Sequence, residues 1–219
     1  MRSHFITSLH TDPRSVTLND VEGKLILFLH QWKTRGVPKR CASALLEAIC
    51  AVQPVLSALS SFRISNVDFD QQLSISNFNN PPNTVADAIE CCYQKLISVK
   101  GLGPTATAKI LHVLLPELCV MWDDPILKYF KSQHNVSGTG IGYVQFLRLL
   151  QAEAQRVIQD FDSIATLNPP RTPNQTLEEY LSAQLSTTHR KTLAKYLDEY
   201  YWVTVTNEVS VPPAWHPDI

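Results

Sequence analysis

The residues best suited to bind an anion lie in a short turn near the middle of the chain. Gly101 and Gly103 are separated by one residue, and Pro104 follows directly. Glycine adopts backbone conformations that other residues resist, and proline is tolerated in the first turn of a helix, where its missing N–H costs no hydrogen bond. A helix that begins at Pro104 is expected to present the free backbone amides of Thr105 to Thr107 and the positive end of its dipole. Such a helix start suits an anion, and a phosphate of a nucleic-acid backbone is the natural one.

The neighbours of the turn complete this candidate site. Leu102, between the two glycines, is expected to pack inward and hold the turn. Lys100 and Lys109 flank the turn and can supply local positive charge, which matters because the whole chain has a net charge of -1 and nucleic-acid binding draws affinity from neutralising phosphates. The alternative interpretation is a tight turn between helices with no ligand. The candidate nucleic-acid contacts lie in this turn and the helix after it: Lys100, Gly101, Leu102, Gly103, Thr105, Ala106, Thr107 and Lys109.

A longer stretch resembles a known family. Residues 99–108, followed by residues 121–126, resemble the hairpin and the aspartate-bearing segment of the helix-hairpin-helix DNA glycosylases, the superfamily that contains endonuclease III. The spacing from Gly101 to Asp123 equals the spacing at which that family carries its catalytic aspartate. The matched segments are a small part of the 219 residues. The resemblance implies a two-lobed all-α fold, DNA as the partner and Asp123 as the catalytic residue.

Three departures from the family pattern narrow the expected activity. The lysine with which some members attack the sugar is replaced here by Thr105, so a lyase reaction at that position has no support. The four closely spaced cysteines that hold an iron–sulphur cluster in other members are absent, because no cysteine follows Cys119. The linker at 115–122 is more apolar than the usual glycine-bearing loop. A monofunctional DNA glycosylase is expected; the alternative is a non-catalytic protein that uses the hairpin fold to bind nucleic acid or another protein.

The resemblance also implies a chemistry for position 123. The enzyme would turn a damaged or mismatched nucleotide out of the duplex and cleave the bond between base and sugar, which develops positive charge on the sugar. Asp123 is expected to stabilise that charge and to orient or deprotonate the attacking water, with no metal or organic cofactor. Asp124, beside Pro125, is the expected helix cap, although the two aspartates can exchange roles. Trp122 either lines the base pocket or belongs to the core.

Apolar residues recur at helical spacing along most of the chain, so the predicted fold class is all-α. Helices are expected at 18–32, 45–54, 54–62, 85–96 and 104–115, from 124 to at least 130, at 143–161, from 177, and near 193–201. A polar surface loop is expected at 63–82, and a short strand or extended tail at 203–211. We expect one domain over 1–219, with one lobe at about 83–150 carrying the hairpin and the other formed by 15–62 and 151–200.

The composition is that of an ordinary globular protein, with 44% hydrophobic and 18% charged residues. The five cysteines form no C-x-x-C pair and fall in apolar helical patterns, which predicts core thiols in a reduced compartment. Residues 1–14 lack a secretory apolar segment, and no run reaches membrane-spanning length, so an intracellular location, nuclear or cytoplasmic, is expected. The basic loop at 34–40 either touches phosphates or is only solvated, and the loop at 137–142 lacks the lysine of a nucleotide-binding loop.

Overall fold

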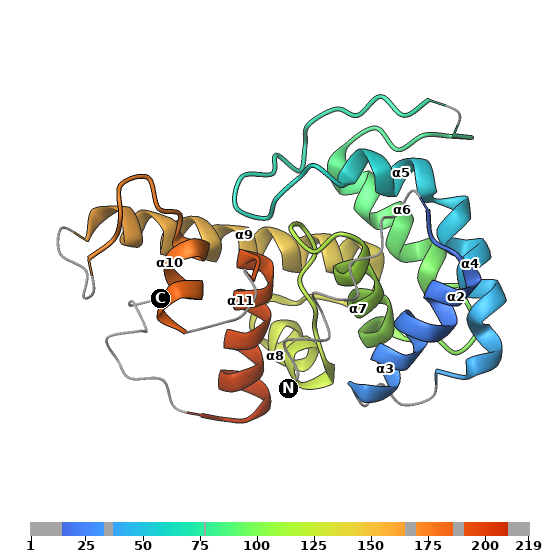
Figure 1. Cartoon of the computed structure of the whole chain (residues 1–219). Helices are drawn as coiled ribbons and strands as arrows, with labels where there is room; N and C mark the ends of the chain where they lie inside the picture. The colour runs from blue at the N-terminus through green and yellow to red at the C-terminus, as the bar shows by residue number, and fades with distance from the viewer. Residues whose placement is uncertain (1–14, 33–36, 77, 165–169, 186–190, 210–219) are drawn as a thin grey trace.

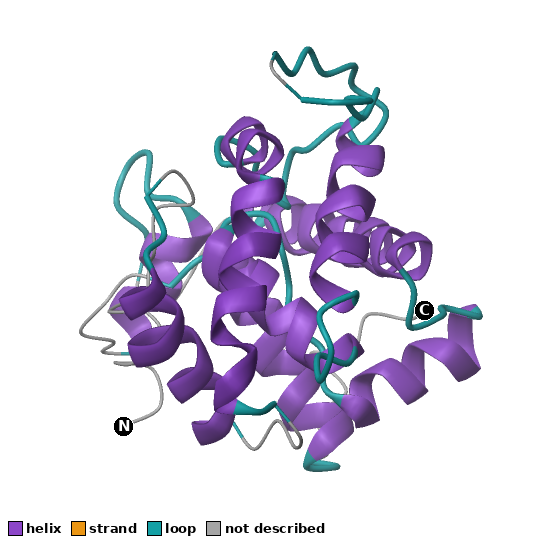
Figure 2. Ribbon diagram, turned by 90° about the vertical axis from the view of Figure 1, so that its right-hand side faces the viewer, coloured by secondary structure: helices purple, strands orange, loops and turns teal. Residues whose placement is uncertain are grey.

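The computed structural model describes residues 15–32, 37–76, 78–164, 170–185 and 191–209, and these residues fold into helices joined by loops (Figure 1). No strand occurs in these ranges; an isolated antiparallel bridge joins Gln72 and Thr84 (Figure 2). The predicted all-α class is confirmed. The predictions for residues 1–14, 34–36 and 210–211 lie outside the described residues. The elements are α2 (Leu18–Asp20), η1 (Val21–Ile26), α3 (Leu27–Gln31), η2 (Lys39–Cys41), α4 (Ala42–Ala51), α5 (Gln53–Leu59), α6 (Val85–Ile97), α7 (Pro104–Leu114), α8 (Asp124–His134), α9 (Gly140–Ser163), α10 (Leu177–Gln184), α11 (Leu193–Tyr201) and η3 (Trp202–Thr206).

Local sequence sets several helix starts. Three helices begin with a threonine that accepts from the backbone N–H three residues on, while the carboxylate of that residue accepts from the threonine N–H. These pairs are Thr17 with Asp20, Thr84 with Asp87, and Thr176 with Glu179. The first predicted helix is found as the consecutive elements α2, η1 and α3, of which η1 is π-helical.

Helix α6 is the centre of the packing. It contacts α9 along much of its length and also packs against α4, α5 and α7. In Figure 1, α9 runs across the back of the molecule, with α4, α5 and α6 at one end and α10 and α11 at the other. In the described part of the chain no single helix is long and apolar enough to cross a membrane; α4 and α5 together, bent by 63°, meet that test of length and composition.

The loop between α5 and α6 is more than a surface loop. Ile64, Val67 and Phe69 are buried, with at most 4% of their surfaces exposed. Arg148 of α9 forms an ion pair with Asp70 at 2.6 Å, and its guanidinium lies 5.0 Å from the Phe69 ring centroid. The predicted loop is confirmed as irregular, but the prediction that it is a surface segment is wrong where these apolar side chains reach the core.

The segment after α11 corrects another prediction. Residues 202–206 form the π-helical η3, whereas a short strand or extended tail was expected there. Tyr201, just before η3, packs against Phe130 of α8 with ring centroids 5.1 Å apart. Contacts with α8 and α11 therefore override the strand preference of the β-branched residues in this segment.

All five cysteines are free. Cys41, Cys92 and Cys119 are buried, as predicted for core thiols, and burial raises the pKa of each. Cys50 is exposed and Cys91 is half-buried. The prediction of a core position is therefore wrong for Cys50, which lies on the outer face of α4.

Candidate nucleic-acid interface and active site

The two glycines of the α6–α7 hairpin have different roles. Gly101 has a φ of 99°, in the left-handed region that favours glycine. Gly103, the N-cap of α7, has a φ of -105°, which any residue can adopt, and a Cβ added there would meet no atom within 4 Å. Leu102 packs inward as expected, with 7% of its surface exposed. The fold therefore requires glycine at 101, while the space beside Gly103 is open.

Two amides at the start of α7, rather than three, precede the first hydrogen bond of the helix, and one of them belongs to a buried residue. The Thr107 N–H donates to the Gly103 carbonyl at 3.0 Å, so the N–H groups of Thr105 and Ala106 precede the first hydrogen bond of the helix. The prediction of a free amide at Thr107 is wrong, because that residue is already one turn into the helix. Ala106 and Thr107 are buried as whole residues, backbone included, so neither contacts a ligand on the surface, and only Thr105 combines a free first-turn amide with exposed surface.

Lys109 is not part of the surface. It is 5% exposed; its Nζ donates to the Trp32 carbonyl at 3.2 Å and lies 5.7 Å from the centroid of the Trp32 ring. Burial lowers the pKa of Lys109, and the carboxylates of Asp123, Asp198 and Asp124 oppose this shift. Because α7 is covered by neighbouring elements, the lysine cannot supply charge to the hairpin turn as predicted. Lys100 is exposed and can do so.

Asp123, and not Asp124, is the cap of α8. Its Oδ1 accepts from the Ile126 N–H at 3.0 Å, and its Oδ2 accepts from the Thr206 hydroxyl at 2.8 Å. The predicted division of roles is corrected in this respect: Pro125 occupies the second helical position rather than the first, which moves the cap one residue earlier. The Asp123 side chain is half-buried.

Asp124 joins the start of α8 to the start of α7. It is exposed, and its Oδ1 accepts from the Thr105 hydroxyl at 2.7 Å. Thr105, in the first turn of α7, is half-buried. The two segments that resemble the glycosylase family are thus brought side by side, and Asp123 lies next to the hairpin.

Trp122 belongs to the core, which resolves the alternatives left open for it. None of its surface is exposed, and its Nε1 donates to the Pro104 carbonyl at 3.1 Å. Its ring centroid lies 5.0 Å from those of Tyr143 and Phe146. A side chain enclosed in this way cannot line a base pocket. Instead it fixes the segment that carries Asp123 against the first turn of α7.

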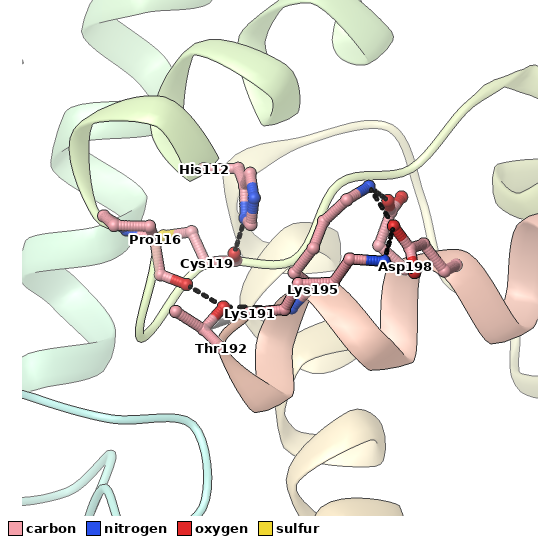
Figure 3. A network of polar contacts seen from close by, with 8 residues as sticks. His112, Pro116, Cys119, Lys191, Thr192, Lys195 and Asp198 are labelled. Carbon is pink, nitrogen blue, oxygen red and sulfur yellow. Dashed lines mark hydrogen bonds and ion pairs between the residues drawn. The ribbon is translucent and has the colours of Figure 1, made fainter. Parts of the chain in front are cut away.

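A buried ion pair lies within α11 (Figure 3). Lys195 and Asp198 of α11 are each 5% exposed and pair with each other. Burial raises the pKa of Asp198, and the Lys195 ammonium opposes that shift. The Lys195 Nζ also lies 4.8 Å from the centroid of the Trp32 ring. Lys109 and Lys195 therefore contact the same indole, from two helices that are far apart in the sequence.

The loop after α7 is held by two further contacts. The Thr192 hydroxyl donates to the Pro116 carbonyl at 2.9 Å, and His112 Nδ1 is 2.6 Å from the Cys119 carbonyl (Figure 3). Because a carbonyl only accepts, the proton of the neutral His112 ring is on Nδ1. Burial, with the Lys195 charge nearby, lowers the pKa of His112 to about 4. His112 is therefore neutral in the folded protein near pH 7.

We expect acid to destabilise the protein through His112. Between pH 6.5 and about 4 the unfolded chain binds a proton at this residue and the folded chain does not, so the free energy of unfolding falls with decreasing pH by roughly 3 kcal/mol. Urea unfolding at pH 7 and pH 4.5 measures this fall. A His112→Asn variant keeps a donor for the Cys119 carbonyl but does not titrate, so it is expected to lose less stability than the native chain. Equal losses in both proteins would contradict the prediction.

Sequence reasoning missed Lys195, Asp198 and Thr206. On a helical surface, a lysine three residues before an aspartate is usually a solvated pair. The signal available for Lys195 and Asp198 was their place among the apolar residues of α11. Thr206 carried no signal, because its partner Asp123 is 83 residues away.

Neither metal ligands nor known proteins give further information about this site. Within the described ranges, no cluster of three or more His, Cys, Asp or Glu residues could hold a metal ion. No family model, no curated protein and no solved structure matches the chain. The functional interpretation therefore depends on the hairpin, on Asp123 and on their contacts.

Proposed function

We propose that the chain binds duplex DNA through the α6–α7 hairpin and hydrolyses the N-glycosidic bond of a flipped, damaged or mismatched base with Asp123. The observation that carries this proposal is the hydrogen bond between Thr105 and Asp124, because it joins the start of α7, the proposed phosphate contact, to the segment whose preceding residue, Asp123, caps α8. The proposal includes the two-lobed arrangement of this glycosylase fold and a role in base excision repair.

The hairpin is suited to the sugar–phosphate backbone. The N–H group of the half-buried Thr105 lies at the positive end of the α7 dipole, and the exposed Lys100 adds a charge beside it. The open space beside Gly103 lets a phosphate oxygen approach the backbone closely. Contacts of this kind fix the position of a protein on DNA without reading its sequence.

Gly103→Asp is expected to weaken duplex binding by at least about tenfold, because the new carboxylate repels the phosphate. Aspartate is a favourable N-cap and the backbone at 103 is extended, so the thermal unfolding temperature should not fall. Fluorescence anisotropy with a labelled duplex, at two salt concentrations, measures the affinity. Gly103→Asn is the matched control, since it adds the same bulk without the charge. Unchanged affinity in both variants would contradict the proposed role of the hairpin.

The chemistry assigned to Asp123 needs only a carboxylate and water. The base leaves with the electron pair of its bond to C1′, the water oxygen bonds to C1′, and Asp123 accepts the proton that the water releases. The carboxylate charge also stabilises the positive sugar in the transition state. Both Asp123 oxygens retain a lone pair after accepting the hydrogen bonds of Ile126 and Thr206. With Thr105 at the place of the family's nucleophilic lysine, the reaction is hydrolysis without strand cleavage.

A non-catalytic DNA-binding or protein-binding role is the second candidate. It is favoured by the hydrogen bonds that both Asp123 oxygens already make within the protein, which are sufficient to explain the residue as a helix cap. The exposed charge of Asp124 beside the hairpin also reduces the attraction for phosphate.

Incubation with a panel of lesion-bearing and mismatched duplexes separates the two candidates. The native chain should leave an abasic site on at least one substrate, seen as strand cleavage only after alkali. Duplex binding without base release on any substrate would favour the second candidate, and an absence of binding would reject both DNA-dependent proposals.

A further inference from the structure

The π-helical segment η3 contacts Asp123, the carboxylate proposed for catalysis. Thr206, the last residue of η3, donates its hydroxyl proton to Asp123 Oδ2 at 2.8 Å. Thr206 is half-buried, as is Asp123. A hydrogen bond to a charged acceptor is stronger than one between neutral groups, so this contact fixes the direction of the second carboxylate oxygen.

The element that carries Thr206 is packed onto the helix that Asp123 caps. Tyr201, at the end of α11, lies 5.1 Å from Phe130 and 6.3 Å from Tyr129, both on α8, between ring centroids. The Asn207 N–H closes the turn by donating to the Trp202 carbonyl at 3.1 Å. The Thr206 hydroxyl is therefore held in place relative to α8 by the core.

Capping of α8 does not require Thr206. The helix amide at Ile126 is satisfied by Oδ1 alone, and Thr206 engages the other oxygen. A carboxylate held at both oxygens keeps its plane fixed, which an acid–base group needs if its free lone pair is to meet a water at one place. We infer that Thr206 is a positioning residue for Asp123, acting through the carboxylate rather than on the substrate; this inference rests on the proposed hydrolase function.

The test compares three variants of the full chain on the best substrate of the lesion panel. Thr206→Val removes the hydroxyl at similar volume and is expected to lower the single-turnover rate roughly tenfold, with the duplex Kd unchanged. Thr206→Ser keeps the donor and should restore the rate to within about threefold of the native value. Thr204→Val is the matched control: its hydroxyl lies in the same segment but donates to the Tyr200 carbonyl, so its loss should leave the rate near native.

Each other outcome overturns the inference. A native rate in Thr206→Val shows that the contact is not used. An equal loss in Thr204→Val shows that the segment as a whole, and not its hydroxyl at 206, sustains activity. A loss that appears only in Kd, or that Thr206→Ser does not restore, excludes positioning of the carboxylate. A native chain that binds duplex but releases no base overturns the proposed hydrolysis itself, which distinguishes that failure from the others.

Discussion

Asp123→Asn is expected to reduce base release by about a hundredfold or more while duplex affinity stays at the native value. Asparagine caps a helix as well as aspartate does, so α8 keeps its hydrogen bond from the Ile126 N–H. The neutral amide, however, neither accepts the proton of water nor stabilises positive charge on the sugar. Single-turnover kinetics on the preferred lesion, with Kd measured on the same duplex, separates the chemical step from binding.

Asp124→Asn is the control for this substitution. It removes a neighbouring negative charge of the same chemical type and alters the hydrogen bond to Thr105, but it leaves Asp123 and its cap intact. We expect its rate to stay within a few-fold of native. A native rate in Asp123→Asn would reject Asp123 as the base. A loss in Asp124→Asn as large as that expected for Asp123→Asn would assign the chemistry to the exposed aspartate instead.

Trp122→Ala is expected to lower the free energy of unfolding by about 3 to 5 kcal/mol. The indole is fully buried against Tyr143 and Phe146, and its removal leaves a cavity and removes the hydrogen bond that Trp122 donates to the Pro104 carbonyl. Urea denaturation followed by circular dichroism measures the change. Trp122 packs the segment that carries Asp123 against α7. The unfolded fraction of the Trp122→Ala protein should therefore also fail to bind duplex DNA.

Two control variants are expected to lose less free energy of unfolding than Trp122→Ala. Trp122→Phe keeps most of the apolar contact and loses the hydrogen bond to Pro104, so a smaller loss is expected. Ile141→Ala shortens a side chain that is 67% exposed and should change stability by less than about 0.5 kcal/mol. A Trp122→Ala protein as stable as the Ile141→Ala protein would show that the aromatic core is not what fixes this region.

Helix starts were predictable from sequence where the cap is local. Thr176 and Glu179 lie three residues apart, so the pattern of the cap is visible in the sequence. The choice between Asp123 and Asp124 was not predictable, because proline is accepted at either of the first two helical positions and shifts the cap by one residue. A local sequence pattern predicts that a helix is present more reliably than it predicts the residue at which the helix begins.

The positions of two polar residues of the candidate site, Lys109 and Thr206, were not predictable from the sequence. Lys109 flanks the hairpin in the sequence but is buried, because Trp32, 77 residues earlier, supplies a carbonyl and a ring for its ammonium. Thr206 was predicted to lie in a strand or tail, because β-branched residues favour that state, yet packing on α8 imposes a helix. In both cases the deciding partner comes from a distant part of the chain, and no local pattern contains it.

The indole of Trp32 has a consequence for the order in which the chain folds. It is contacted by Lys109 from the middle of the chain and by Lys195 from near the end of the described residues. During synthesis the first helices therefore emerge long before the partner that completes their packing. Contacts of such high sequence separation slow folding, because a long loop must close before they form. Emergence of α11 from the ribosome is thus expected to be the step after which the packing around Trp32 becomes cooperative.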